Sequence, residues 1–272
     1  IAMPSPPSYL NAASRGEDIY FFYQMHYTNV FDLIAPDGGP VSKPEDLKGL
    51  TVGVSELSGG EVPFVRVIMS EAGLAEGTDY EIVPIGEGGA LTLEALQSGD
   101  VQAYSSSIYD IASLEAAGQS VVSIMPTEYR NYPANGFVAT GAVIDEREDD
   151  FVRFLRAVNK AVVFGRTNPD AVLDILVPTR PDLYDDPVIV EAFWKATLGM
   201  MTPPAEVADA AIGLHYKPGW QGLYEFLRAA PEDEGGLPAD VDLDTRLMTR
   251  LIEASQDFDV AAIQEQATTY AG

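Results

Sequence analysis

The chain has 272 residues, 46% of them hydrophobic, and a formal net charge of −26 from 42 Asp and Glu against 16 Lys and Arg. This surplus of negative charge argues against nucleic acid and anionic membrane surfaces as partners, because both would repel the protein. There is no Cys and there are only two His, His26 and His215, so disulfides, thiolate metal sites and multi-His metal sites are excluded.

The N-terminal part of the chain predicts short elements. A helix is expected over 9–15, strands over 19–27 and 30–35, a turn over 37–40 and a short helix over 43–47. No apolar run reaches the ~18 residues that a membrane-spanning helix needs. The first residues also lack the basic start and unbroken apolar core of a signal peptide.

From residue 50 the pattern becomes regular. Strands are expected over 50–54, 80–85, 101–104 and 121–125, with helices over 62–73, 90–98 and 108–117 between them. Strands that alternate with helices at this spacing indicate a parallel sheet covered on both faces.

The remainder is nearly all helical. After a strand over 135–140, apolar residues recur at helical spacing from 151 to 163, and a further helix starts at Asn168-Pro169. The elements expected next are a linker over 178–187, helices over 187–199, 204–213, 219–229 and 244–254, an acidic stretch over 231–242, and a last helix from about Asp259.

These elements predict an α/β protein with two lobes and a mostly helical C-terminal region. Lobe one would comprise 1–36 and 128–272, and lobe two, an inserted α/β lobe, would comprise 42–127. The crossovers between them would lie near 30–36 and 135–140, with hinge motion through 30–36 and 128–136.

An ordered set of motifs resembles a known family. KPEDLKGLTVGV over 43–54 is similar to the "DLKGKKIGV" entry to the second lobe of solute-binding proteins of ABC importers. EALQSGDVQA over 94–103, GFVAT over 136–140, the segment from Trp220 to Leu227 and the Leu-Pro and Val-Asp-Leu pieces of 237–243 follow in the family's order. The chain is identified on these motifs as resembling the NMT1/THI5-like family of sulfonate, nitrate, taurine and thiamine-pyrimidine binding proteins.

The resemblance implies a type II periplasmic-binding-protein fold. It implies that the chain, as a monomer without a cofactor or catalytic activity, captures a small organic solute of pyrimidine, aromatic or sulfonate type between two lobes. The solute would be delivered to a membrane permease, which places the protein in the periplasm or another extracytoplasmic space. It also implies that a strand–helix unit of lobe one precedes Ile1, and an upstream signal peptide or membrane anchor is compatible with this.

Three loops at the carboxyl ends of strands are candidates for one wall of the ligand site. In the first, the glycines would let backbone N–H groups approach a ligand at a helix start, or Ser58 would simply cap a tight turn. A second loop over 86–89 is expected to be structural or at the rim. In the third, hydroxyls could donate to a ligand and an aromatic ring could stack on it, or the serines could cap a helix. The candidates are Ser58, Gly59, Gly60, Ser105, Ser106, Tyr109 and Asp110.

Lobe one should supply the opposite wall. His26 could hydrogen-bond a ligand, although a lone His is more often a surface or structural residue. Arg130 could pair with a sulfonate or carboxylate, or it could be an ordinary surface charge. The candidates are Ser5, Ser8, His26, Tyr27, Asn29, Arg130 and Asn135.

Two other functions share this fold class. One is an enzyme of pyrimidine metabolism, against which the absence of Cys argues, and the other is a ligand-sensing domain. A single Arg near the loops, together with many Tyr, Ser and Asn, favours an aromatic or amide-rich solute over a small inorganic anion, and a sulfonate stays open.

Overall fold

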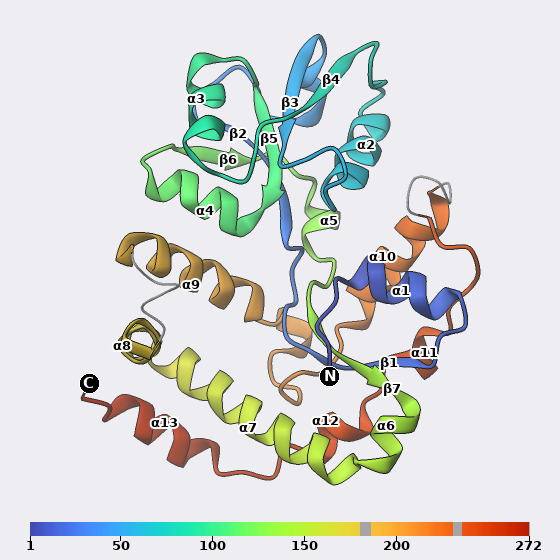
Figure 1. Ribbon diagram of the computed structural model, residues 1–272, viewed down its shortest axis with the longest axis vertical. Helices are drawn as coiled ribbons and strands as arrows, with labels where there is room; N and C mark the ends of the chain where they lie inside the picture. The colour runs from blue at the N-terminus through green and yellow to red at the C-terminus, as the bar shows by residue number, and fades with distance from the viewer. Residues whose placement is uncertain (180–185, 231–235, 272) are drawn as a thin grey trace. The chain divides into compact units, whose positions relative to one another are not determined.

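The computed structural model describes residues 1–179, 186–230 and 236–271 (Figure 1). The chain divides into two compact units. Unit 1 contains Ile1–Thr28, Tyr132–Val190 and Thr197–Gly272, and unit 2 contains Asn29–Asn131 and Glu191–Ala196. The expected linker over 178–187 and acidic stretch over 231–242 lie partly outside the described residues.

Unit 2 is built on a five-stranded sheet with the order β4-β3-β5-β2-β6. Its strands are β2 (Phe31–Pro36), β3 (Leu50–Val54), β4 (Tyr80–Pro84), β5 (Ala103–Ser107) and β6 (Val121–Ser123). β3 pairs in parallel with β4 and β5, as the alternating pattern predicts. β2 instead pairs antiparallel with β5 and β6. It enters the sheet without a preceding crossover helix, so nothing imposes the parallel direction on it.

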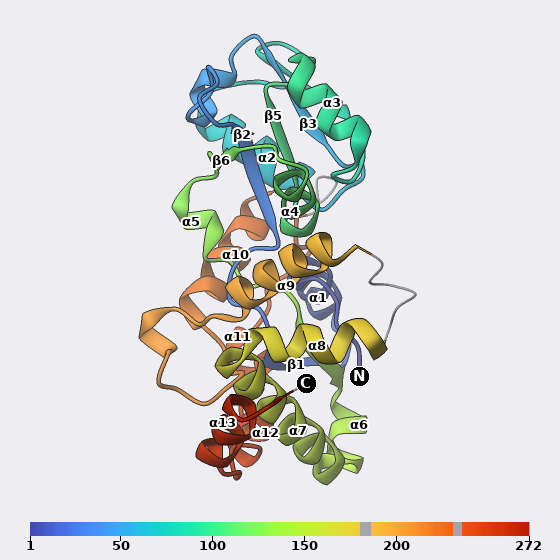
Figure 2. The same cartoon turned by 90° about the vertical axis from the view of Figure 1, so that its left-hand side faces the viewer.

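Helices cover both faces of this sheet. The unit's helical elements are η1 (Pro44–Leu47), α2 (Val62–Glu71), α3 (Ala90–Ser98), α4 (Ile108–Ala116) and α5 (Thr127–Arg130). The crossovers from β3 to β4 and from β4 to β5 run in opposite directions, so right-handed connections place α2 and α3 on opposite faces (Figure 1). α3 and α4 share one face, where Leu96, Tyr104 and Leu114 belong to a single buried cluster (Figure 2).

Unit 1 combines a small sheet with many helices. β1 (Ile19–Gln24) pairs antiparallel with β7 (Gly136–Thr140), with a register shift between Phe21 and Tyr23. The helical elements are α1 (Pro6–Ser14), α6 (Gly141–Glu146), α7 (Glu148–Thr167), α8 (Pro169–Thr179), α9 (Pro187–Met201), η2 (Ala205–Val207), α10 (Lys217–Ala229), α11 (Leu243–Arg246), α12 (Arg250–Ala254) and α13 (Val260–Thr268). The middle of α9 belongs to unit 2.

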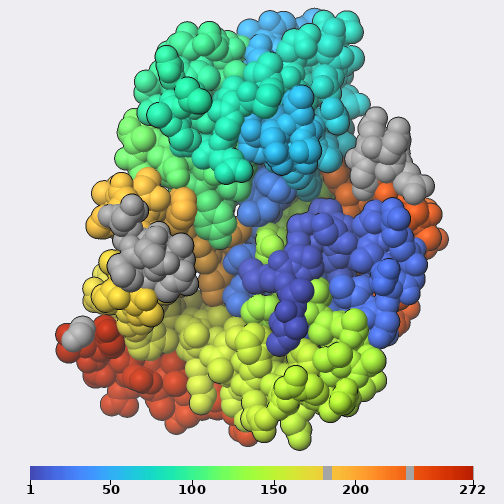
Figure 3. Space-filling view, viewed as in Figure 1, coloured from blue at the N-terminus to red at the C-terminus, as the bar shows by residue number. Residues whose placement is uncertain are grey.

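The core of unit 1 joins β1 to helices from the middle and the C-terminal part of the chain. Phe22 and Tyr23 pack with Phe151 and Leu155 of α7 and with residues of α12. α1 lies at the surface of this unit, dark blue in Figure 3. In the part of the chain that is described, no helix is long and apolar enough to cross a membrane.

Two expected helices are wrong. The segment 204–213 forms only the short η2, and Gly213 adopts a φ of 87° with the ring of Tyr23 packed where a Cβ would stand. The segment 244–254 is split into α11 and α12. Between them Leu247 forms a bridge to Phe21, and the N–H of Met248 donates to the Phe21 carbonyl at 2.9 Å. In both places tertiary contacts override local helix propensity.

The boundaries of the units differ in detail from the expected lobes. Residues 29–36 and 128–131, which the sequence assigns to lobe one, cluster with unit 2. The cause is local, because β2 pairs with β5 and β6 of this unit. In addition, the side chain and the N–H of Asn29 donate to the carbonyls of Tyr129 and Arg130 in α5.

Candidate functional site

The three candidate loops follow neighbouring strands of unit 2. Residues 55–61 follow β3, residues 86–89 follow β4, and β5 leads directly into α4 at Ser107. Because these three strands are parallel and adjacent, their carboxyl ends lie on one edge of the sheet. That edge is where ligands bind in open α/β sheets.

The two glycines of the first loop make room for side chains of the protein itself. A Cβ at Gly60 would lie 2.7 Å from the ring of Phe31. A Cβ at Gly59 would lie 2.6 Å from the carboxyl carbon of Glu61. Ser58 is exposed at the start of this turn, and the N–H of Gly59 donates to the Glu56 carbonyl at 3.0 Å. The loop is therefore a tight turn whose glycines have a packing role besides any contact with a ligand.

Glu61 is a residue that the sequence reasoning missed. It is the N-cap residue of α2 and only 2% exposed. Its Oε1 accepts hydrogen bonds from the backbone N–H of Ser55 at 2.9 Å and from the Ser55 hydroxyl. A sequence signal existed, because an acidic residue just before an apolar helix is favoured by the helix dipole. The sequence did not reveal that this carboxylate is buried against the loop.

The second loop is held by the phenol of Tyr104. The Tyr104 hydroxyl donates to the Gly86 carbonyl at 2.7 Å and accepts from the N–H of Gly88 at 3.2 Å. Gly88 has a φ of 69°, and a Cβ there would lie 2.7 Å from the Cα of Asp110. This loop is therefore packed against the start of α4.

The third segment differs from its expected form. The strand expected over 101–104 is displaced, because β5 runs from Ala103 to Ser107 and buries Ser105 and Ser106. The Ser105 hydroxyl donates to the backbone carbonyl of Asp32 at 2.9 Å. The Ser106 and Ser107 hydroxyls donate to Oδ2 of Asp110 at 2.6 and 2.7 Å. The hydroxyl protons of the candidate residues Ser105 and Ser106 are therefore already engaged within the protein. Ser107 is the N-cap of α4.

The carboxylates of two loops lie near the same phenol. Burial raises the pKa of Tyr104 to about 12, and the negative charges of Asp110 and Glu61 act in the same direction, while hydrogen bonds from Ser106 and Gly88 oppose the shift. A phenol with this pKa stays protonated at neutral pH and keeps its hydrogen bonds.

The ring of Tyr109, at the start of α4, meets Phe193 of α9 edge to face, with centroids 5.5 Å apart.

Asn29 and Arg130 serve the backbone of unit 2. The Asn29 amide donates to the Tyr129 carbonyl at 3.3 Å and accepts from the N–H of Phe31 at 3.0 Å. The Arg130 guanidinium donates to the carbonyls of Met125 at 3.1 Å and Ser123 at 3.4 Å. These contacts tie β2 and β6 to α5.

Asp32, on β2, has a raised pKa. Burial is the main cause, and a hydrogen bond from Ser123, the N–H of Leu33 and the charge of Arg130 act against it. The positive charge of Arg130 thus acts on a carboxyl group of its own unit.

In unit 1, three of the expected residues come together. The N–H of His26 donates to the Asn135 carbonyl at 3.0 Å, and the Asn135 amide donates to the carbonyl of Pro4, next to Ser5, at 3.4 Å. Ser5 is the N-cap of α1, and its hydroxyl donates to the Ser8 hydroxyl at 2.9 Å. His26 is 6% exposed, and its Nδ1 has no hydrogen-bond partner among the described residues. Burial lowers the pKa of His26 to about 4, so the imidazole is neutral at neutral pH.

Tyr27 and Ser8 lie in different surroundings. Tyr27 is buried, its N–H donates to the Met200 carbonyl at 2.7 Å, and burial raises the pKa of its phenol. Ser8 is exposed and lines a surface pocket of about 410 Å³ together with Asn11, Arg15 and Asp18. The guanidinium of Arg15 is bound to Asn11 at 2.9 Å.

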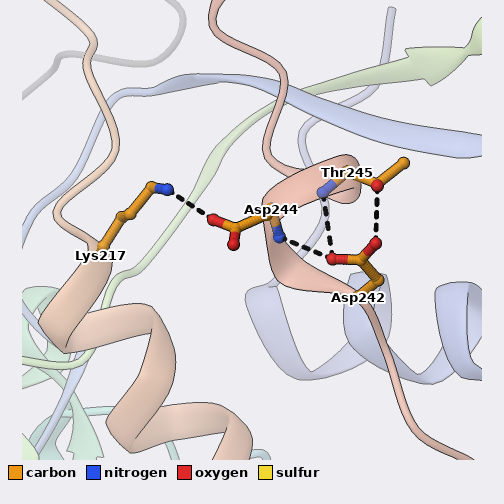
Figure 4. A network of polar contacts seen from close by, with 4 residues as sticks. All are labelled: Lys217, Asp242, Asp244 and Thr245. Atoms are coloured by element: carbon orange, nitrogen blue, oxygen red, sulfur yellow. Dashed lines mark hydrogen bonds and ion pairs between the residues drawn. The ribbon is translucent and has the colours of Figure 1, made fainter.

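A second surface pocket of about 370 Å³ lies between α10 and the segment 241–247. Figure 4 shows its polar network. Lys217 pairs with Asp244 at 2.5 Å, and Asp242 accepts hydrogen bonds from the Thr245 hydroxyl at 2.7 Å and from backbone N–H groups of α11. These bonds lower the pKa of Asp242. Lys217 and Asp244 are thus paired with each other and Asp242 is bonded within α11, and we assign this pocket no ligand.

No group of three or more metal-ligating side chains is arranged to hold an ion within residues 1–179, 186–230 and 236–271. Ser58, Gly59, Gly60, Ser106 and Asp110 gather at the edge of the unit 2 sheet, and Ser5, His26 and Asn135 gather in unit 1.

Comparisons with known proteins fit this fold. The sequence model of the family described as NMT1/THI5 like matches residues 1–172. The riboflavin-binding protein RibY of Chloroflexus aurantiacus is 24% identical over 252 residues, which cover 89% of this chain and 67% of that protein.

Two solved structures illustrate how widely the fold is used. The periplasmic sulfonate-binding protein SsuA from Methylobacillus flagellatus KT superposes with a TM-score of 0.57 at 17% identity, covering 96% of this chain and 73% of that chain. The desulfurization enzyme DSZB superposes with a TM-score of 0.61 at 17% identity, covering 93% of this chain and 84% of that chain. At these identities the likeness shows the fold alone.

Proposed function

The chain belongs to the NMT1/THI5-like family, and on this premise we propose that it is the solute-binding component of an ABC importer. It captures a small organic solute of pyrimidine, aromatic or sulfonate type and delivers it to a membrane permease. The observation that carries the proposal is the convergence of three loops at the carboxyl edge of the parallel strands β4, β3 and β5.

The loops of unit 2 are suited to binding rather than to covalent chemistry. The loop after β3 presents Ser58 and Gly60, while the N–H and carbonyl of Gly59 are bonded to Glu56 and Val62. The phenol of Tyr109 stands at the start of α4. Small organic ligands are held in proteins by such a combination of apolar surface and a few placed polar groups. Ser106 and Asp110 support this wall through their mutual hydrogen bond.

Unit 1 contributes the second set of residues in this proposal. The N–H of His26 donates to the Asn135 carbonyl, and the Asn135 amide donates to the carbonyl of Pro4, next to Ser5. Within the described ranges, Nδ1 of the His26 imidazole has no hydrogen-bond partner. A buried polar atom without a partner is costly unless a ligand or water satisfies it. Capture of the solute between two lobes, with hinge motion through the crossovers, is part of the same proposal.

The permease partner, the monomeric state and an extracytoplasmic location complete the proposal. They are supported by family membership and by the names of relatives with the same fold, which include a periplasmic sulfonate-binding protein. The name of the relative RibY supports including flavins among the solutes to be tested.

A catalytic role is not part of the proposal. The sequence has no Cys, and burial lowers the pKa of both His26 and His215 to about 4. General acid–base catalysis near neutral pH needs a pKa close to the working pH. The similarity to the enzyme DSZB is one of fold.

The test is a thermal-shift screen of the protein over flavins, pyrimidines, sulfonates and small anions. A solute at ~100 times its Kd should add about 2.7 kcal/mol to the free energy of unfolding. Small-angle scattering with the solute that stabilises the protein then checks closure, which should reduce the radius of gyration.

A matched pair of variants assigns the site. Gly59→Leu fills the loop after β3 and should abolish the thermal shift, whereas Gly199→Leu, at a position with open space in α9, should retain it. Absence of any stabilising solute would argue against the transport function. A normal shift in Gly59→Leu would remove this loop from the site.

A further inference from the structure

The loops at the edge of the unit 2 sheet carry acidic side chains and no basic ones. Residues 55–61, 86–89 and 105–110 include Glu56, Glu61, Glu87 and Asp110, and none of their positions is Lys, Arg or His. An anionic solute group that approached these loops would meet like charges and no compensating cation.

Glu61 differs from the other acidic residues of these loops in its burial. It is 2% exposed, whereas Glu56 and Glu87 are exposed. Its carboxylate is fixed by the N–H of Ser55 at 2.9 Å and by the Ser55 hydroxyl. A buried charge is screened less by water and salt than an exposed one, so it acts more strongly on a neighbouring group.

The carboxylate lies beside the start of α2, where it accepts from Ser55 and makes no capping hydrogen bond to the N–H groups of the helix. α2 has ten residues, and an N-terminus of this kind attracts negative charge through its N–H groups and dipole. The Glu61 side chain lies over Gly59, with the carboxyl carbon 2.6 Å from the position of a Cβ there. The glycine is therefore needed to admit the protein's own carboxylate.

Within the proposed function, we propose that Glu61 is a specificity-determining residue whose buried carboxylate, lying over Gly59 beside the start of α2, repels anionic ligand groups from this loop. This part of the site then receives an uncharged or hydrogen-bond-donating part of the solute, such as the N–H edge of a heterocycle. It rejects sulfonate and phosphate groups by charge.

The proximity of a second carboxylate strengthens the effect. Tyr104 lies within electrostatic range of both Glu61 and Asp110, whose charges both raise its pKa. The guanidinium of Arg130, in the same unit, donates to the carbonyls of Ser123 and Met125. The field at this edge therefore favours donors over acceptors.

The test is a titration of the full chain with methanesulfonate, read from the backbone amide resonances of Gly59 and Gly60. Glu61→Gln removes the charge but keeps an oxygen that can accept from Ser55. In the unmodified protein the two amides should show no saturable shift. In Glu61→Gln they should shift saturably, with an apparent affinity at least about tenfold higher.

Glu56→Gln is the matched control, because it makes the same charge change at an exposed position of the same loop. It should behave as the unmodified protein does. Should Glu61→Gln fail to fold, Glu61→Met makes the same charge change with a side chain of similar length.

Two results would overturn the proposal. One is a saturable methanesulfonate response at Gly59 and Gly60 in the unmodified protein, and the other is an equal response in Glu61→Gln and Glu56→Gln. This titration does not use the transported solute, so its failure is distinct from that of the proposed function. A screen without any stabilising solute would reject transport and leave the role of Glu61 to the titration.

Discussion

The side-chain oxygen of Gln24 accepts a hydrogen bond of 3.1 Å from the indole nitrogen of Trp220, which lies 196 residues further along the chain. The same oxygen accepts from the N–H of Tyr216 at 2.8 Å, and the amide nitrogen donates to the His26 carbonyl at 3.2 Å. Gln24 is 1% exposed. One buried amide thus joins the end of β1, the start of α10 and the backbone of a candidate ligand residue.

Replacing Gln24 with Leu should destabilise the protein by about 2–4 kcal/mol, because the buried donors of Trp220 and Tyr216 lose their acceptor. Urea unfolding followed by Trp fluorescence measures the loss. Gln221→Leu, an exposed change on α10, should stay within about 0.5 kcal/mol of the unmodified protein. Equal stabilities of the two variants would contradict the role given to Gln24.

Gly59→Ala should displace the Glu61 carboxylate from Ser55, because the new methyl group would occupy its place. The loss of hydrogen bonds to a charged group is expected to cost about 1.5–3 kcal/mol. Thermal or chemical unfolding gives the value. Gly89→Ala, at a position with open space in the neighbouring loop, is the control and should change stability little. A Gly59→Ala protein as stable as the control would show that the carboxylate moves at no cost.

The free energy of unfolding should fall as the pH is lowered from about 6.5 to 4. Burial lowers the pKa of His26 and of His215 to about 4, so in this range the unfolded chain binds more protons than the folded one. Stability is complete above the unfolded pKa and is lost as the pH falls, by about 3 kcal/mol for each His. Asp32 acts with the opposite sign, because burial raises its pKa.

His215→Phe isolates one of these contributions. Urea unfolding at a series of pH values gives the free energy of unfolding as a function of pH. Its slope should be smaller for the variant, because the variant lacks the contribution of one His. The comparison removes the effect of Asp32, which both proteins carry. Identical slopes would show that His215 titrates normally in the folded protein.

The buried pair of Tyr23 and Asn159 should be energetically coupled. The Tyr23 hydroxyl donates to Asn159 at 2.9 Å, and the Asn159 amide donates to the Ser255 hydroxyl at 3.0 Å. A double-mutant cycle with Tyr23→Phe and Asn159→Leu should give a coupling energy of about 0.5–3 kcal/mol. The exposed pair Asn11 and Arg15, bonded at 2.9 Å on α1, serves as the control cycle and should couple by less than about 0.5 kcal/mol. Additive effects in the buried cycle would contradict the network.

The local patterns predicted the regular part of the fold well. The helix expected over 90–98 is α3 with the same bounds, and the strand expected over 50–54 is β3. These segments combine a clear apolar period with a glycine stop or a turn, so local physics decides them. The helix expected over 244–254 failed because Leu247 and Met248 bind to Phe21, a contact that local sequence cannot reveal.

The candidate site also has a part that the sequence could predict and a part that it could not. The residues of the loops after β3 and β5 could be found from small polar residues at the ends of strands. The side chains that occupy those loops could not, because Ser105 and Ser106 are buried by a strand that continues to Ser107, three residues beyond the expected end at 104.

The sequence by itself determined the α/β alternation, the acidic charge, the absence of Cys and the ordered motifs of the family, because composition, periodicity and local motifs are carried by neighbouring residues. Only the tertiary structure decided that β2 runs antiparallel in the sheet of unit 2, that Gln24 reaches Trp220 and that the Glu61 carboxylate lies buried over Gly59. The direction of a strand, a long-range hydrogen bond and the burial of a charge depend on which distant segments pack together, and that is settled by the free energy of the whole fold.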